Sequence, residues 1–340
     1  MAAERKSLRV RQPILTNWKL IATVNNPAYV NPMNTRTALV LVLLLVAAAV
    51  ALSFTLARRS GTPDLVWGQK GVQDGAVSRP RAAAIDPQGR LFLVDFTARI
   101  QAYDLDGQHL GVTFTTPDFR NGRPSGLSID RDGNLLVSDS HYHCVRVYTH
   151  DGVELKKIGG EAGKLPGQFG YISDCVQDAA GFYYISEFGQ NDRITKLDLD
   201  GKFVACFGES GQGPKQFARI RALAFGPDGH LYIVDACNHR IQVLTTDGEF
   251  VREFGGPGQG PGEFHFPYDL AFNDAGELYV VERGNHRVQK LTKEGVPLAT
   301  WGTPGREPGQ LADPWALAVD KQGRVHVVDT ENHRVQRVKF

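Results

Sequence analysis

The chain has 340 residues and a formal net charge of +1, and its charges are unevenly distributed. Residues 1–60 hold eight Lys or Arg residues and one acid, which leaves 30 basic and 36 acidic residues after position 60, a net charge of −6. Nucleic-acid-binding domains are usually basic, so this balance argues against DNA or RNA as the partner.

The first predicted element is a membrane-spanning segment at residues 37–57. These 21 residues lie between Arg36 and Arg58 and contain no charge, and about 20 apolar residues suffice to cross a bilayer core. Residues 1–36 carry six Lys or Arg residues and one acid, which predicts a basic tail on the cytoplasmic side. We therefore expect a short linker at 58–63 and, after it, an extracytoplasmic domain that is periplasmic or at the cell surface.

Two alternatives concern this N-terminal segment. Thr55 and Ala57 are small enough for a cleavage site, so residues 37–57 can also be interpreted as a signal peptide. Met33 directly precedes the apolar run and is a second candidate start, in which case residues 1–32 precede the protein. The length of the apolar run favours the membrane anchor.

A repeat fills the chain from residue 64 to the end. An acidic residue that closes an apolar run recurs at intervals of 44 to 48 residues, and a fixed period of this length is typical of repeat architectures. These acids are Asp95, Asp139, Glu187, Asp235, Glu282 and Asp329. Each copy contains four short strand-like runs separated by Gly, Asn, Asp and Pro. Six copies of four antiparallel strands predict an all-β, six-bladed β-propeller over residues 64–340.

The ends of the repeat region predict how the propeller closes. The last copy stops at Phe340, after its third strand, whereas DLVWG at 64–68 matches the ends of fourth strands elsewhere. We expect the N-terminal strand to complete the last blade, which leaves no blade edge unpaired.

These copies resemble NHL repeats. The resemblance rests on PxxLAVDxxG from Pro314 to Gly323 and on VDxxNHRVQ from Val328 to Gln336, and looser copies extend it to residues 64–340. It implies the six-bladed propeller fold. Propellers of this kind bind proteins, RNA or small ligands, and a few are enzymes. The function must therefore be argued from individual residues.

The tripeptide NHR recurs every 47 residues, starting at Asn238, Asn285 and Asn332. We interpret it as a structural turn between the second and third strands, in which the preceding acid accepts hydrogen bonds from the turn or from the Arg. The alternative is a zinc site formed by His239, His286 and His333. Equivalent positions in successive blades lie too far apart for Zn–N bonds of about 2 Å, which argues against it.

Cysteine contributes little to the function. Cys175 aligns with leucines of other blades, which predicts a buried free thiol. The four cysteines form no CxxC motif, so neither haem attachment nor a redox motif is supported, and the presence of disulfides stays open.

Aligning the copies places one residue of each inner strand at the mouth of the central channel: Arg81, Ser125, Ser173, Arg221, Tyr268 and Trp315. Blade six neighbours blade one, so Arg221, Tyr268, Trp315 and Arg81 form a continuous arc opposite the two serines. Two Arg beside two aromatics can hold a carboxylate and a stacked apolar group. Asp174 and Asp269, at the next position, can bind a cation or pair with these Arg. These residues form the candidate binding site, and the alternative is that they only fill the channel mouth.

Two classes of function follow. The first is a membrane-anchored binding or scaffold domain for a protein, peptide or glycan. The second is an extracytoplasmic lyase or hydrolase with a metal on the propeller axis. The resemblance to NHL-like amidating lyases implies zinc histidines after the Pro that opens an inner strand, but no copy has His there, and His265 precedes Pro267. The sequence also lacks GxSxG and HExxH motifs. It therefore favours binding without a cofactor and leaves a divalent cation on the axis open.

Overall fold

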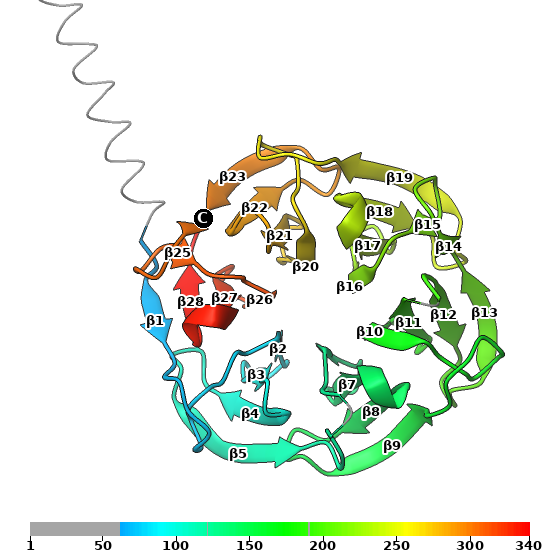
Figure 1. Ribbon diagram of the computed structural model, residues 1–340, viewed down its shortest axis with the longest axis horizontal. Helices are drawn as coiled ribbons and strands as arrows, with labels where there is room; N and C mark the ends of the chain where they lie inside the picture. Colours follow the sequence, from blue (N-terminus) through cyan, green and yellow to red (C-terminus); the bar gives the residue numbers. More distant parts are fainter. Residues whose placement is uncertain (1–61, 121, 190) are drawn as a thin grey trace, which may run out of the picture. The chain divides into compact units, whose positions relative to one another are not determined.

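The computed structural model describes residues 62–340 except Asn121 and Gln190. Six four-stranded antiparallel sheets surround a central opening, as Figure 1 shows. The predicted six-bladed propeller is confirmed. The predicted tail, the predicted membrane span at 37–57 and the start of the linker lie outside the described residues. In the part that is described, no helix is long and apolar enough to cross a membrane.

The first three blades follow in chain order. Blade one consists of β2 (Ala82–Ile85), β3 (Leu91–Val94), β4 (Arg99–Tyr103) and β5 (His109–Thr115). Blade two consists of β6 (Gly126–Ile129), β7 (Leu135–Asp139), β8 (Cys144–Tyr148) and β9 (Glu154–Gly159). Blade three consists of β10 (Tyr171–Gln177), β11 (Tyr183–Phe188), β12 (Ile194–Leu197) and β13 (Phe203–Phe207). In each blade the first strand lines the central opening.

The next two blades repeat this order, and the sixth closes the ring. Blade four consists of β16 (Ile220–Phe225), β17 (Leu231–Asp235), β18 (Arg240–Leu244) and β19 (Phe250–Gly255). Blade five consists of β20 (Pro267–Phe272), β21 (Leu278–Glu282), β22 (Arg287–Leu291) and β23 (Pro297–Trp301). Blade six consists of β26 (Ala316–Val319), β27 (Val325–Asp329), β28 (Arg334–Val338) and β1 (Leu65–Trp67).

Short elements complete the connections. Two parallel pairs lie in the loops between blades: β14 (Glu209–Ser210) with β15 (Gln216–Phe217), and β24 (Thr303–Pro304) with β25 (Gln310–Leu311). Three turns form single 3-10 helices, η1 (Ser140–Tyr142), η2 (Ala236–Asn238) and η3 (Thr330–Asn332).

The propeller closes through the N-terminal strand, as predicted. β1 pairs antiparallel with β28, with Val66 opposite Gln336. The Arg337 guanidinium donates to the Asp64 carboxylate at 2.9 Å, and the Trp67 ring lies 4.7 Å from that of Tyr103 in blade one. Blade six therefore takes its last strand from the beginning of the repeat region and presents no open edge on that side.

The hydrophobic core lies between the blades. Six apolar clusters each combine side chains of two neighbouring sheets, because strands such as β3 and β21 are buried on both faces. The closing cluster joins Leu91 and Tyr103 of blade one to Val328 and Val335 of blade six. Cys175 belongs to the cluster between blades two and three and is a buried free thiol, as predicted.

The NHR tripeptide is a structural turn, as blade four illustrates. The buried Asp235 carboxylate accepts hydrogen bonds from the Asn238 amide at 2.9 Å and from the Arg240 guanidinium at 2.9 Å. It also accepts the backbone N–H of Ala218 at 2.8 Å, in the loop that enters the inner strand. The turn after the second strand and the loop before the first strand are thereby held together on one face of the propeller.

The histidine of the tripeptide connects neighbouring blades. His239, His286 and His333 take the left-handed backbone conformation, with φ between 51° and 57°. Their Nδ1 atoms accept backbone N–H groups of the next blade's entry loop, for example Phe266 N–H on His239 at 3.0 Å and Asp313 N–H on His286 at 3.2 Å. Within the described residues, no group of three or more His, Cys, Asp or Glu side chains could hold a metal ion.

Candidate functional site

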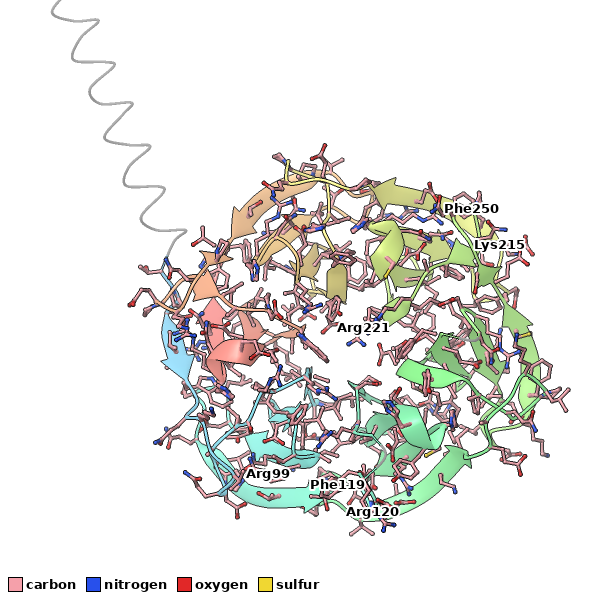
Figure 2. The ribbon with its side chains drawn as sticks, viewed as in Figure 1. Arg99, Phe119, Arg120, Lys215, Arg221 and Phe250 are labelled. Atoms are coloured by element: carbon pink, nitrogen blue, oxygen red, sulfur yellow. The ribbon has the colours of Figure 1, made fainter. Side chains whose placement is uncertain are left out.

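The predicted arc forms a row of stacked side chains at the channel mouth. Tyr268 and Trp315 contact edge to face, with ring centroids 5.6 Å apart. The Arg221 guanidinium carbon lies 4.6 Å from the Tyr268 centroid and 5.3 Å from that of Trp315. Arg81 lies 4.9 Å from the Trp315 centroid. Figure 2 shows Arg221 reaching toward the central opening. Inner-strand residues of blades four, five, six and one thus meet.

Three further residues, which the sequence reasoning missed, lengthen this row at both ends. The guanidinium carbon of Arg81 lies 5.1 Å from the centroid of the Phe96 ring, and that of Arg123 lies 4.1 Å from it. At the other end, Arg283 lies 5.5 Å from the Tyr268 ring. We call the whole set the mouth ladder, in the spatial order Arg123, Phe96, Arg81, Trp315, Arg221, Tyr268 and Arg283. A signal existed, since Phe96 and Arg283 each directly follow the acid that ends a second strand.

The aromatic rings of the ladder each contact two guanidinium groups. Tyr268 contacts those of Arg221 and Arg283, and Trp315 contacts those of Arg81 and Arg221. The rings therefore fix the positions of the arginines, whose in-plane N–H groups are left to recognise a ligand. That the rings also stack on an apolar group of a ligand stays a prediction.

Arg221 is a buried charge of the ladder that no ion pair compensates within the described residues. Its side chain is 7% exposed, and its buried Nε has no hydrogen-bond partner among the described residues. Burial lowers the pKa of Arg221, and the neighbouring Arg219 adds to this, while Tyr268 and Asp269 oppose it. A buried charge without a partner is costly, so Arg221 is suited to bind an anion.

Arg81 shares this electrostatic environment. Burial lowers the pKa of Arg81 to about 10, and repulsion from Arg221, Arg123 and Arg79 adds to the effect. Two neighbours are compensated: Arg79 pairs with Glu331, and Arg283 pairs with Asp313 at 2.9 Å. The centre of the ladder, at Arg81 and Arg221, therefore carries positive charge that no ion pair compensates in the described part of the chain.

The serine side of the mouth is internally satisfied. The Ser125 hydroxyl donates to the Ile172 carbonyl at 3.1 Å, and the Ser173 hydroxyl contacts the Ser186 hydroxyl at 2.8 Å. These contacts tie blade two to blade three and one strand to the next. The two sides of the channel mouth thus differ in hydrogen bonding as well as in side-chain size.

Asp174 and Asp269 bridge blades. Each follows a β-bulge in its inner strand. The Asp174 carboxylate accepts the N–H of Leu223 in blade four at 2.9 Å, and that of Asp269 accepts the N–H of Leu317 in blade six at 3.0 Å. The expected alternative of ion pairing with the arc is not observed, since no ion pair joins either carboxylate to an arginine within the described part of the chain.

Both carboxyl groups hold protons strongly. Burial raises the pKa of Asp174 to about 8. Repulsion from Asp269 also raises it, whereas the hydrogen bond from the Leu223 N–H lowers it. Burial also raises the pKa of Asp269 to about 7, opposed by the bonds from Leu317 and Leu270 and by Arg221. A carboxyl group in this state can donate a hydrogen bond near neutral pH.

These carboxyl groups lie between two cavities on the axis. The upper cavity, of about 30 Å³, is lined by the arc, by Ser125 and by both aspartates. The lower cavity, of about 320 Å³, is lined mainly by apolar residues, among them Ile85, Ile129 and Val319, and again by both aspartates. Asp174 and Asp269 therefore lie where the two cavities meet, a place that we call the neck, and Arg81 and Arg221 line the upper cavity beside them.

Family comparisons agree with this architecture. Residues 218–290 match the model described as a 6-bladed beta-propeller, and residues 121–148 and 311–338 match the NHL repeat. The chain is a six-bladed propeller with NHL repeats. The NHL propeller is also similar in sequence to peptidylglycine alpha-amidating monooxygenase of Rattus norvegicus and of Mus musculus, with 35% identity over 113 residues in each case. That stretch is 31% of this chain but only 12% of the length of either relative.

Solved structures share the fold at low sequence identity. A streptogramin B lyase aligns with a TM-score of 0.59 and 15% identity, over 80% of this chain and 96% of the lyase. Virginiamycin B lyase from Staphylococcus aureus aligns at 0.57 and 18%, over 81% and 85% of the two chains. An auxiliary nutrient binding protein from Bacteroides thetaiotaomicron aligns at 0.62 and 13%, over 82% and 75%. At such identities the likeness concerns the fold alone, and both lyases and binding proteins use it.

Proposed function

We propose that this NHL propeller is a binding module that captures an acidic protein, peptide or glycan at the channel mouth. The observation that carries the proposal is the buried Arg221 guanidinium, which contacts the rings of Tyr268 and Trp315, forms no ion pair within the described residues and has no hydrogen-bond partner for its Nε. Arg81 on the far side of Trp315 supplies a second guanidinium. Two oriented guanidiniums match the planar oxygens of a carboxylate.

The experiment compares capture by three forms of the protein. Wild-type protein and Arg221→Gln are used to capture partners from solubilised membranes, and bound proteins and glycans are identified. The proposal expects acidic partners on the wild type that are lost on the variant. Arg219→Gln is a matched control, because Arg219 is exposed and is not part of the ladder. Equal capture by all three forms would show that the binding site is not at the channel mouth.

The alternative is a metal-dependent lyase or hydrolase. The partial likeness to the amidating monooxygenases and the fold shared with two lyases favour it as the second candidate. Asp174 and Asp269 would then act on the axis, although the zinc histidines of the amidating lyases have no counterpart at the inner-strand openings. Metal analysis of the purified protein separates the candidates, because a stoichiometric divalent metal that Asp174→Asn removes supports catalysis.

We also propose that the propeller is anchored outside the cytoplasm by residues 37–57. The uncharged stretch and the basic tail before it support this topology. Protease added to intact cells, or to spheroplasts if an outer membrane is present, should digest the propeller. Protection until the membrane is lysed would contradict the topology, and mature protein that starts at Arg58 would establish cleavage instead.

A further inference from the structure

The upper cavity combines opposite chemical groups in a very small volume. The positively charged Arg221 and the carboxyl-bearing Asp174 and Asp269 all line it. Arg221 and Asp174 are 7% and 8% exposed. Asp174 uses each carboxylate oxygen for one backbone N–H, from Cys175 and from Leu223. Each oxygen retains further hydrogen-bonding capacity toward the cavity.

The volume limits what can enter. A buried site needs roughly 10–15 Å³ for each water-sized group, so about 30 Å³ accommodates two such groups. A carboxylate presents two oxygens in one plane, whereas sulfate and phosphate groups present tetrahedral oxygens. A guanidinium forms bidentate pairs with carboxylates and with phosphates alike, so the discrimination comes from the small volume of the cavity. The cavity therefore selects a carboxylate over a tetrahedral anion.

Charge imposes a second condition. A ligand carboxylate on Arg221 would lie beside two aspartates that also line the cavity. Two carboxylates at hydrogen-bonding distance are stable only when they share a proton. The ligand and at least one aspartate must then form such a pair.

We propose that the neck captures a carboxylate-bearing ligand together with one proton, with the ligand oxygens on Arg221 and the proton shared with Asp174 or Asp269. This inference rests on the proposed function and adds the head group and its coupling to pH. No covalent bond forms, and the proton comes from solvent. An acidic peptide and a uronate glycan both supply this head group.

The groups that face the aspartates are few. Arg221 comes from β16, Asp269 lies beside Tyr268 on β20, and Arg81 precedes β2. β6 and β26 contribute Gly126 and Ala316, which do not titrate. Cys175 follows Asp174, and burial raises the pKa of its thiol well above the ordinary value. Burial lowers the pKa of Arg81 to about 10, so Arg81 stays mostly charged up to pH 9. Burial also lowers the pKa of His141, which lies near Arg81.

The test is a titration of the full-length protein with acetate at pH 6.5 to 9, followed by the fluorescence of Trp315. Acetate stays ionised throughout, so the affinity should fall roughly tenfold per pH unit once the pH exceeds the pKa of about 8 of Asp174. Binding in weakly buffered solution at pH 8.5 should take up protons. A short peptide with one Glu and an oligogalacturonate are titrated in parallel to distinguish the two sources.

Variants isolate the coupling. Asp174→Asn and Asp269→Asn replace an ionisable group by a neutral one, so the acetate affinity of the double variant should lose most of its pH dependence between pH 6.5 and 9. Either single variant serves if the double variant does not fold. Asp130→Asn is the matched control, because Asp130 is also a buried carboxyl that holds a turn but lies outside the channel, and it should keep the wild-type profile.

The outcomes separate the inference from the proposed function. Acetate binding that needs Arg221 but does not change from pH 6.5 to 9 would overturn the inference and leave the proposed function intact. Sulfate that binds as tightly as acetate would overturn the carboxylate assignment. Acetate binding that is unchanged in Arg221→Gln would contradict the proposed function, because that function places the anion on Arg221.

Discussion

Blade four contains two buried arginines with opposite surroundings. Arg240 is 9% exposed and Arg221 is 7% exposed. Arg240 donates to Asp235 and Glu253 and to the carbonyls of Gly213 and Gln216, all within 2.9 Å. Arg221 forms no ion pair within the described residues. It contacts the Tyr268 and Trp315 rings and lines a cavity together with Asp174 and Asp269. Buried arginines therefore have two different roles in this blade. Arg240 stabilises a loop, whereas Arg221 places a positive charge without an ion-pair partner at the channel mouth.

This contrast can be tested by removing contacts of each kind. The largest effect is expected where structural contacts are most numerous, in the closing strand. Deleting residues 61–68 removes β1, the Trp67 contact with Tyr103 and the Asp64 bond to Arg337. Loss of a fully buried aromatic costs about 3–5 kcal/mol, so loss of the half-buried Trp67 together with the β1–β28 pairing should lower the free energy of unfolding by an amount of this order in chemical denaturation. Deletion of residues 1–57 is the control, and equal stability of the two truncations would disprove closure by β1.

The second prediction concerns the partnered arginine. Asp235→Ala leaves Arg240 without its buried partner, and breaking a buried ion pair in this way costs about 3–5 kcal/mol. The denaturation midpoint should fall accordingly, whereas acetate binding at the mouth should persist at temperatures where the variant is folded. Loss of binding together with an unchanged midpoint would reverse the roles assigned to the two arginines.

The third prediction concerns the unpartnered arginine. Arg221→Gln and Trp315→Ala should weaken capture of an acidic partner by about 2 kcal/mol or more, which is about thirtyfold, because central Arg and Trp residues dominate binding surfaces. The stability of Arg221→Gln should stay equal or rise, since a buried unpaired charge is removed. Binding affinity and denaturation midpoint are measured on the same preparations. A midpoint that falls while the affinity stays constant would show that the arc only packs the channel mouth.

The fourth prediction is a pH dependence of stability. Asp174 and Asp269 have folded pKa values of about 8 and about 7, above the usual value of about 4 in unfolded chains. The folded state therefore binds more protons, and these two groups contribute stability that is fully present below pH 4 and is lost as the pH rises toward 8. Unfolding curves of wild type and Asp174→Asn from pH 5 to 9 should differ in slope, with the variant flatter. Parallel curves would contradict the raised pKa of Asp174.

The smallest expected effect is that of His286→Ala. The variant loses an acceptor for the Asp313 N–H, a bond of 3.2 Å between blades five and six, and one hydrogen bond is worth about 1 kcal/mol. Thermal denaturation should show a modest decrease, and acetate affinity should be unchanged. An affinity that falls as far as in Arg221→Gln would place the histidines of the NHR turns in the site.

The candidate site could be predicted in part. The repeat alignment brought Arg221, Tyr268 and Trp315 together, because equivalent positions in consecutive blades are neighbours around the axis. It did not reveal Arg123 and Phe96, since the contact between them joins a loop of blade two to a turn of blade one. The roles of the aspartates were also out of reach, because a carboxylate near arginines suggests an ion pair, whereas the bulges direct both carboxylates to backbone N–H groups of the following blades.

The sequence by itself determined the number of blades, the strand order and the closure by residues near position 65, because each of these follows from a period and from the match of one fragment to the missing part of a copy. It also determined the role of the NHR turn, whose contacts lie mostly within one repeat. Only the tertiary structure decided which charges are partnered. That property depends on distances of a few ångströms between side chains of different blades, and no repeat pattern encodes them.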